Sequence, residues 1–169
     1  MSDSGVSEEV RGTLALALDV DDLVAATRMA RELKPWFGVA KVGLELYSAA
    51  GPDAIGAMRD LGYDVFLDLK LHDIPATMGR SVARAAAMGV AYLTVHGVSG
   101  AESLRAAADN AGSTRLLAVT VLTSLDSPAL RAIGLEGGPR EAVDRLARLA
   151  WDAGVRGFVT SAHECAGLR

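Results

Sequence analysis

Short apolar runs alternate along the chain with longer segments in which apolar residues recur at helical spacing. Runs of four to eight apolar residues are typical of strands buried on both faces of a parallel sheet. They lie at residues 14–18, 39–43, 63–70, 91–96, 116–122 and 157–160. The first five recur about every 25 residues, which is the length of one strand plus one helix. The pattern therefore predicts consecutive parallel βαβ units.

Capping residues and prolines predict where the intervening helices begin and end. Asp21 or Asp22 can cap a helix that ends before Pro35. Further helices are expected after Gly51 with Pro52 in the first turn, near Ala76, at Ser99 with Glu102 in a capping box, from about Pro139 to Ala153, and after Ser161 with Glu164 as its cap partner. Residues 124–138 are expected to form a long loop.

Two architectures fit this alternation: an open doubly wound sheet and a closed (β/α)8 barrel. A doubly wound sheet usually carries a Gly-rich turn after its first strand, whereas residues 19–22 read Asp-Val-Asp-Asp. Polar residues instead gather at the ends of several predicted strands, as in barrel enzymes: Asp19, Lys41, Asp68, Lys70, His96 and Thr123. We therefore predict one TIM-barrel domain over residues 1–169 that contains about six of the eight βα units.

Composition narrows the class of protein further. The chain has 169 residues, and 17 Lys and Arg against 21 Asp and Glu give a formal net charge of −4, which argues against a nucleic-acid or anionic-membrane partner. No apolar run approaches the ~18 residues of a membrane-spanning helix, and residues 1–5 lack the features of a signal peptide. A single cysteine, Cys165, suits a reducing compartment. These features predict a cytoplasmic globular domain.

Charged side chains occur within the apolar runs, although a strand buried on both faces is expected to be apolar. Asp68 and Lys70 are two residues apart and therefore share one face of a strand, while Leu67 and Leu69 point to the other. If helices cover the sheet, the leucines meet the helices and the two charges face the barrel interior or its mouth. Removing such charges from water is costly unless they are paired. Lys41, within the second apolar run, is a further charge that would be costly to bury unless it is paired.

Asp19 follows the first run, so that four charged residues converge at the predicted strand ends. One interpretation is a structural ion-pair network, which perturbs pKa values without catalysis. The convergence favours a catalytic array instead. Opposite charges would keep Lys70 an ammonium that can protonate a carbanion. A carboxylate such as Asp68 would repel a negative substrate group, and that repulsion ends when the group leaves as a neutral molecule. The array points to decarboxylation or a related carbanion reaction.

The histidines and the cysteine carry weaker signals. His72, His96 and His163 lack metal-ligand spacing, so no metal site is predicted. His96 ends a predicted strand, where it either lines a pocket or is a hydrogen-bonded structural residue. Cys165 has no obvious base and is expected to be inert.

These segments together resemble the orotidine 5′-phosphate decarboxylases, in particular the bacterial form. The matching segments are Leu16–Asp19, Lys41–Glu45, Asp68–Thr77, Thr94–Gly97 and Val119–Ser124. They follow one another in order and cover nearly the whole chain. The Asp-x-Lys-x-x-Asp-Ile-Pro core within Asp68–Thr77 is the specific part of the resemblance.

The resemblance implies a TIM barrel that converts orotidine 5′-phosphate to uridine 5′-phosphate and CO₂ in pyrimidine biosynthesis, without a metal or organic cofactor. By that resemblance Lys70 is the proton donor, and Lys41, Asp68 and Asp73 form the catalytic charged array with it. The implied substrate-binding residues are Asp19 on the ribose side, Lys41, Asp68, Lys70, Asp73, Ile74, Thr77 and Thr123. The implied assembly is a homodimer in which Asp73 and Thr77 complete the neighbouring subunit's site.

Two other hypotheses remain open at the sequence level. One is a magnesium-dependent sugar-phosphate decarboxylase or aldolase of the same superfamily, such as a 3-keto-gulonate 6-phosphate decarboxylase, and the other is a non-catalytic barrel fragment. The resemblance also implies two further strands with phosphate-binding Pro-Gly and Gly-Arg segments, which have no match up to Arg169. We therefore expect this 169-residue chain to be an incomplete or impaired form of the enzyme.

Overall fold

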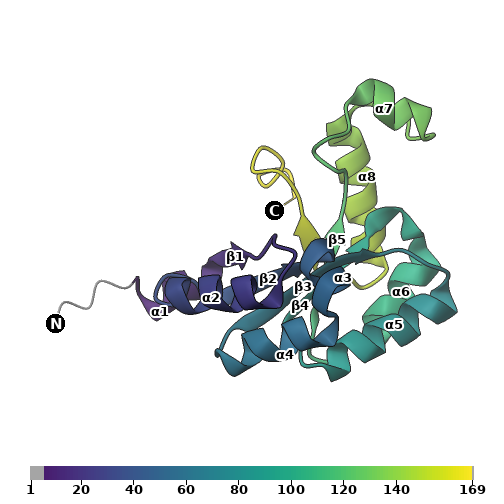
Figure 1. The fold of residues 1–169 in the computed structure, drawn as a ribbon. Helices are drawn as coiled ribbons and strands as arrows, with labels where there is room; N and C mark the ends of the chain where they lie inside the picture. The colour runs from purple at the N-terminus through teal and green to yellow at the C-terminus, as the bar shows by residue number, and fades with distance from the viewer. Residues whose placement is uncertain (1–5, 169) are drawn as a thin grey trace. The chain divides into compact units, whose positions relative to one another are not determined.

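The computed structural model describes residues 6–168, so residues 1–5, on which the prediction of no signal peptide rests, lie outside it. Strands and helices alternate along the described residues (Figure 1). The strands are β1 (Ala15–Ala17), β2 (Val39–Gly43), β3 (Asp64–Leu71), β4 (Tyr92–His96), β5 (Arg115–Val119) and β6 (Gly157–Val159). All the strands predicted from the apolar runs are confirmed. No helix among the described residues has the length and apolar character needed to cross a membrane.

Helices connect the strands, and several begin where the sequence predicts. They are α1 (Glu8–Thr13), α2 (Leu23–Leu33), α3 (Leu44–Ala50), α4 (Pro52–Asp60), α5 (Pro75–Ala87), the 3₁₀ turn η1 (Gly97–Ser99), α6 (Ala101–Asp109), α7 (Ser127–Ala132) and α8 (Pro139–Asp152). Asp22 is the N-cap of α2, and its carboxylate accepts hydrogen bonds from the N–H groups of Val24 and Ala25. Pro52 and Pro139 begin their helices, because a first-turn residue needs no N–H partner.

The strand order decides between the two architectures. The described strands form one sheet in the order β1-β2-β3-β4-β5-β6, so each strand lies beside its neighbour in the sequence. A doubly wound sheet instead reverses its order at a switch point, whereas a barrel adds each parallel strand on the same side. The fold-class prediction of a partial (β/α)8 barrel is confirmed.

The chain divides into two compact units, and the first contains residues up to Leu69 together with Ala85–Leu93. Its strands β1, β2 and β3 pair in parallel, with Ala17 opposite Lys41 and Gly43 opposite Asp68. Leu46, Ile55 and Met58 of the covering helices are almost fully buried, as are Val42 and Leu67 of the sheet. The unit therefore has an apolar core of its own.

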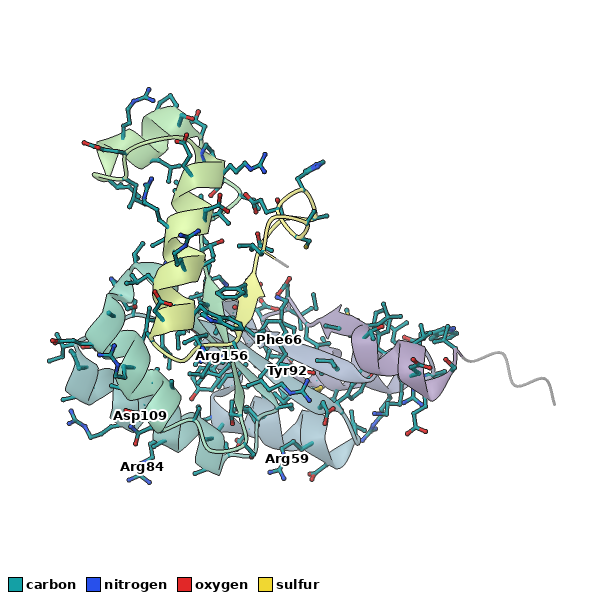
Figure 2. The ribbon with its side chains drawn as sticks, turned by 180° about the vertical axis from the view of Figure 1, so that it is seen from behind. Arg59, Phe66, Arg84, Tyr92, Asp109 and Arg156 are labelled. Atoms are coloured by element: carbon teal, nitrogen blue, oxygen red, sulfur yellow. The ribbon has the colours of Figure 1, made fainter. Side chains whose placement is uncertain are left out.

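A hydrogen bond and an aromatic contact join elements of this unit. The Tyr63 hydroxyl donates a hydrogen bond of 2.7 Å to the main-chain carbonyl of Ala30 in α2. Phe66 and Tyr92 meet edge to face with ring centroids 6.1 Å apart (Figure 2). The first contact joins the residue before β3 to α2, and the second joins β3 to β4.

The second unit contains Lys70–Arg84 and the chain from Thr94 onward. Its strands β5 and β6 pair in parallel, with Leu117 opposite Gly157. Helix α8 buries one apolar face, made of Ala142, Val143, Leu146, Ala147 and Ala150. Gly97 admits this helix, because a Cβ there would lie 3.0 Å from the Val119 carbonyl and 3.4 Å from the Leu146 Cβ.

Several local predictions were wrong. Ser99 does not cap α6: the N-cap is Gly100, which has no side chain, and Ser99 ends η1 with its hydroxyl 2.7 Å from His72 Nδ1. The strand expected over 116–122 ends at Val119. Glu164 accepts hydrogen bonds from Ser161 as expected, but the residues after it form turns. The sequence reading also missed α1, α3 and α7, because six or seven residues are too few to show a helical period.

Candidate active site

A charge pair lies at the carboxyl ends of the first two strands. Lys41 stands in β2 between the fully buried Ala40 and Val42, and its Nζ is 2.8 Å from the Asp19 Oδ1. The side chain of Lys41 is 22% exposed and that of Asp19 is 60% exposed. The N–H of Leu18 donates to the main-chain carbonyl of Lys41, and this bond sets Asp19 beside the lysine. The pair is therefore preformed at the edge where barrel enzymes carry their chemistry.

Gly43 leaves space for this pair. A Cβ built on Gly43 would lie 3.3 Å from Asp19 Oδ1 and 3.5 Å from Lys41 Nζ. Gly43 is also the partner of Asp68 in β3, and residues opposite each other in a parallel sheet project to the same face. Asp68, which is partly buried, therefore shares a sheet face with Lys41 and Asp19. The first unit brings these three predicted site residues to one face.

Lys70 follows two residues after Asp68 in β3 and begins the second unit. Its backbone has φ of 51°, and among residues 6–168 it is the only residue other than glycine in the left-handed region. The extended backbone that the sequence analysis assumed is thus interrupted at this lysine. Its N–H donates a 2.8 Å hydrogen bond to the Oγ1 of Thr94, a residue of β4 that is fully buried.

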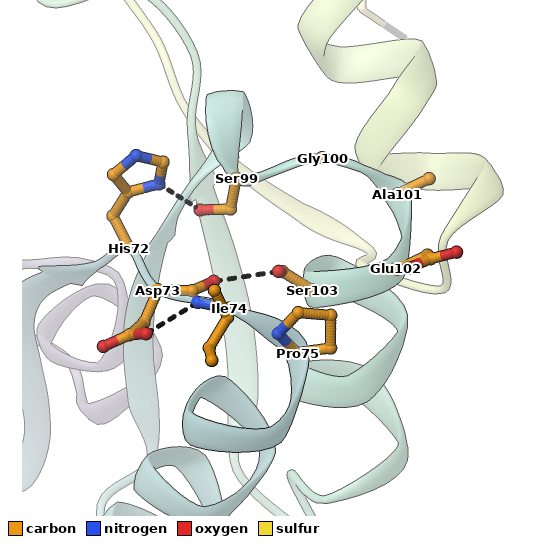
Figure 3. Close-up of a pocket in the computed structure, with 9 residues that line it drawn as sticks. All are labelled: His72, Asp73, Ile74, Pro75, Ser99, Gly100, Ala101, Glu102 and Ser103. Atoms are coloured by element: carbon orange, nitrogen blue, oxygen red, sulfur yellow. Dashed lines mark hydrogen bonds between the residues drawn. The ribbon is translucent and has the colours of Figure 1, made fainter.

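The loop after β3 forms one wall of an open cavity of about 710 Å³ (Figure 3). His72, Asp73, Ile74 and Pro75 line one side, and residues 99–103 line the other. The Ser103 hydroxyl donates a hydrogen bond of 2.8 Å to the main-chain carbonyl of Asp73. The Asp73 carboxylate accepts a hydrogen bond of 2.7 Å from the N–H of Ile74. These bonds hold the backbone of the loop while the Asp73 side chain stays exposed.

Thr77 and Thr123 lie elsewhere in the second unit. Thr77 is in the first turn of α5, and its hydroxyl accepts a long 3.5 Å hydrogen bond from Arg80. Thr123 is exposed in a turn, four residues beyond the end of β5 at Val119. Within the described part of the chain, neither threonine lines the cavity beside Asp73. Their predicted roles in substrate binding stay predictions.

His96 ends β4, and its surroundings lower the pKa of its imidazole. Its ring centroid is 5.9 Å from that of His72, and its Nδ1 is buried without a hydrogen-bond partner among the residues described. Burial lowers the pKa of His96 below its ordinary value of 6.5, and the positive charges of His72 and Lys70 lower it further. These surroundings favour the neutral form of His96.

Three polar residues of this region were missed as site components: Thr94, Ser99 and Ser103. A signal was present for Thr94, because a hydroxyl in the middle of an apolar strand is a buried polar group that needs a partner. The two serines gave no such signal, since their partners lie about 30 residues away in the chain. Among the described residues, no three His, Cys, Asp or Glu side chains are grouped as a metal site.

Comparison with known proteins gives consistent matches. Residues 12–169 match the orotidine 5′-phosphate decarboxylase / HUMPS family. A protein from Anaeromyxobacter sp. (strain K), named orotidine 5′-phosphate decarboxylase, is 54% identical over 157 residues, which are 92% of this chain and 69% of that protein. One of the same name from Thermobifida fusca (strain YX) is 48% identical over 92% of this chain and 67% of its own length.

Solved structures show the same likeness. The crystal structure of orotidine 5′-phosphate decarboxylase from Lactobacillus acidophilus superposes with a TM-score of 0.85 at 34% identity, covering 94% of this chain and 75% of the other. The structure of an uncharacterized conserved protein from Geobacillus kaustophilus gives a TM-score of 0.86 at 33% identity, covering 91% of this chain and 76% of the other.

Proposed function

The chain belongs to the orotidine 5′-phosphate decarboxylase / HUMPS family, and on that premise we propose that it converts orotidine 5′-phosphate to uridine 5′-phosphate and CO₂ in pyrimidine biosynthesis. In the structure, the observation that supports this function best is the Lys41–Asp19 pair, which shares a sheet face with Asp68. A fixed array of alternating charges offers an electrostatic field that needs no rearrangement during reaction.

The proposed reaction breaks one bond and forms one bond. The carboxylate at C6 of the pyrimidine is placed against Asp68, and the repulsion between the two anions is relieved when CO₂ leaves as a neutral molecule. The electron pair of the broken bond stays on C6, and the Lys70 ammonium donates the proton that converts this carbanion to product. Lys41 and Asp73 complete the charged array, and Asp19 binds the ribose.

The other proposed features concern assembly and surroundings. We expect a cytoplasmic homodimer in which Asp73 and Thr77 reach the neighbouring subunit's site, with Ile74 and Thr123 also binding substrate. The exposure of Asp73 and the 66% exposure of Ile74 support a role outside their own subunit's core. We expect no cofactor and no nucleic-acid partner, and the acidic net charge of −4 supports the second expectation.

A decarboxylation assay tests the proposal. The loss of absorbance of orotidine 5′-phosphate is followed with the wild-type chain and with Lys70→Ala, in the presence and absence of EDTA. Turnover that persists in EDTA and is abolished in Lys70→Ala supports the proposed function. Lys34→Ala is the matched control, because it removes a lysine that is not among the predicted site residues. Lys34 lies directly after α2, and its ammonium stacks on the Tyr63 ring.

Other outcomes distinguish the alternatives. Turnover that EDTA abolishes, or turnover of 3-keto-gulonate 6-phosphate, would support the magnesium-dependent sugar-phosphate reaction, which the names of the relatives do not favour. Binding of uridine 5′-phosphate with no turnover by either protein would support a non-catalytic nucleotide-binding module.

A further inference from the structure

Lys70 has a backbone conformation that the rest of the structure must hold in place. A residue with a Cβ is disfavoured at φ of 51°, because the Cβ crowds the following carbonyl oxygen. Lys70 has this conformation near the end of β3, where the backbone is otherwise extended. Strained backbones of this kind persist only where surrounding contacts over-determine them.

One such contact is the hydroxyl of Thr94. Its Oγ1 accepts the Lys70 N–H at 2.8 Å, so a side chain of β4 holds the main chain of β3 at the strained residue. Thr94 is fully buried, and so are Leu93 and Val95 on either side of it. Packing alone would be satisfied by valine, which has the same shape, whereas a buried hydroxyl is costly unless it is hydrogen-bonded. The bond from the Lys70 N–H occupies an acceptor position of this hydroxyl, which valine could not supply.

The direction of the lysine side chain depends on this backbone. The φ and ψ of Lys70 decide in which direction its Cα–Cβ bond points relative to the neighbouring peptide groups. Relaxation of φ to the extended region would therefore turn the whole side chain. Thr94 and His96 lie two residues apart in β4 and so share a face of the strand. The hydrogen bond from the Lys70 N–H to the Thr94 Oγ1 places the main chain of Lys70 beside this face.

We propose that Thr94 is a positioning residue for Lys70, and that its hydroxyl holds the left-handed backbone which directs the lysine ammonium to the reacting carbon. The proposal rests on the proposed function of Lys70 as proton donor. The proposed action of Thr94 is through the main chain of Lys70, to which its hydroxyl is bonded. Because proton transfer requires close alignment, a small error in the position of the ammonium is costly to the chemical step.

The test compares Thr94→Val, which removes the hydroxyl and keeps the shape, with Thr94→Ser, which keeps the hydroxyl. We expect Thr94→Val to lower kcat by about 10- to 100-fold with KM changed by less than about threefold, because the alignment of the proton donor acts on the proton-transfer step more than on substrate binding. Thr94→Ser should recover most of kcat. Thr114→Val is the matched control, since Thr114 is a buried threonine at the opposite end of the strands, before β5.

A second measurement does not depend on turnover. Hydrogen exchange of the Lys70 amide, followed by NMR, should accelerate at least about tenfold in Thr94→Val and stay slow in Thr94→Ser and Thr114→Val. Thr94→Ala takes the place of the valine variant if that variant does not fold. If the wild-type chain lacks decarboxylase activity, the proposed function fails, while the amide exchange still decides whether Thr94 holds Lys70.

The proposal is overturned by any of three results. They are an unchanged kcat in Thr94→Val, a Lys70 amide that stays equally protected without the hydroxyl, and an equal loss of kcat in Thr94→Ser and Thr94→Val. The last result would mean that the shape of the side chain matters and its hydroxyl does not.

Discussion

Lys41 and Asp19 lie 22 residues apart in the chain, yet the Lys41 Nζ is 2.8 Å from the Asp19 Oδ1. Their main chains are joined as well, because the Leu18 N–H donates to the Lys41 carbonyl. The charges are thus fixed by strand pairing before any substrate binds. Such preorganisation costs the protein nothing at the moment of reaction.

Removing this pair should affect activity far more than stability. Lys41→Met and Asp19→Asn should each lower the free energy of unfolding by less than about 1 kcal/mol, because ion pairs open to water contribute little. Each should lower kcat/KM by about 100-fold or more, because the charge acts on the developing transition state. Urea unfolding and steady-state kinetics measure the two effects. A large loss of stability with normal activity would make the pair structural, as the competing sequence interpretation holds.

Gly43→Ala should disturb the same pair without removing a charge. The new Cβ would lie 3.3 Å from Asp19 Oδ1, so the carboxylate must shift by a few tenths of an ångström, while the backbone φ of −90° suits alanine. We expect kcat/KM to fall by roughly 10-fold with little change in Tm. Kinetics and thermal unfolding of the variant check this. Unchanged kinetics would show that the position of Asp19 tolerates this shift.

His96 should make the protein less stable in acid. Its folded-state pKa lies below 6.5, because of its burial and the positive charges of His72 and Lys70, so the unfolded chain binds the proton more readily. No stability is lost on this account well above pH 6.5; stability falls as the pH drops through 6.5, and the loss is complete below the folded-state pKa. His96→Gln should therefore show a weaker loss of stability between about pH 7 and 5 than the wild type.

Urea unfolding at several pH values measures this difference. His163→Gln is the control, because it removes a histidine that is exposed in the turn after β6. Equal pH dependence in His96→Gln and wild type would show that another group carries the acid sensitivity.

Two glycines with open space around them should respond in opposite directions to alanine. Gly56 lies in the middle of α4, where a Cβ would meet nothing within 4 Å. Gly56→Ala should stabilise the protein by about 0.5–1 kcal/mol, because alanine loses less backbone entropy in a helix. Gly51 is equally open but has φ of 56°, so Gly51→Ala should destabilise by about 1 kcal/mol. Thermal unfolding of the two variants measures both effects. A higher Tm in Gly51→Ala would contradict the expectation that the positive φ of Gly51 disfavours alanine.

Elements that depend on neighbouring residues follow the sequence pattern most closely. Strand β2 has the predicted bounds, and Asp22 caps α2 as expected, because both depend on residues within one turn or one strand. Ser99 shows the limit of such reasoning. It has the spacing of a capping box with Glu102, but Gly100 takes the cap position and the serine hydroxyl meets His72 instead. A contact with a distant residue replaced a plausible local one.

The candidate site likewise combines residues that a local pattern marks with contacts between distant residues that it does not. Asp68 and Lys70 were singled out because charges inside an apolar strand need a reason. A hydroxyl in an apolar strand marked Thr94 as a residue that needs a partner, but the identity of this partner could not be derived, because it is a residue with a left-handed backbone in another strand. Strain of that kind is a property of the folded surroundings and leaves no mark in the amino-acid pattern.

By itself, then, the sequence determined the alternation of strands and helices, the start of a helix at Asp21 or Asp22, and the charged residues that call for a chemical explanation. These follow from periodicity and capping, which act over a few residues. Only the tertiary structure decided the sequential strand order, the Asp19–Lys41 distance and the hydrogen bond from Lys70 to Thr94. The physical reason is that strand pairing joins residues more than 20 positions apart, and no local preference specifies which of them meet.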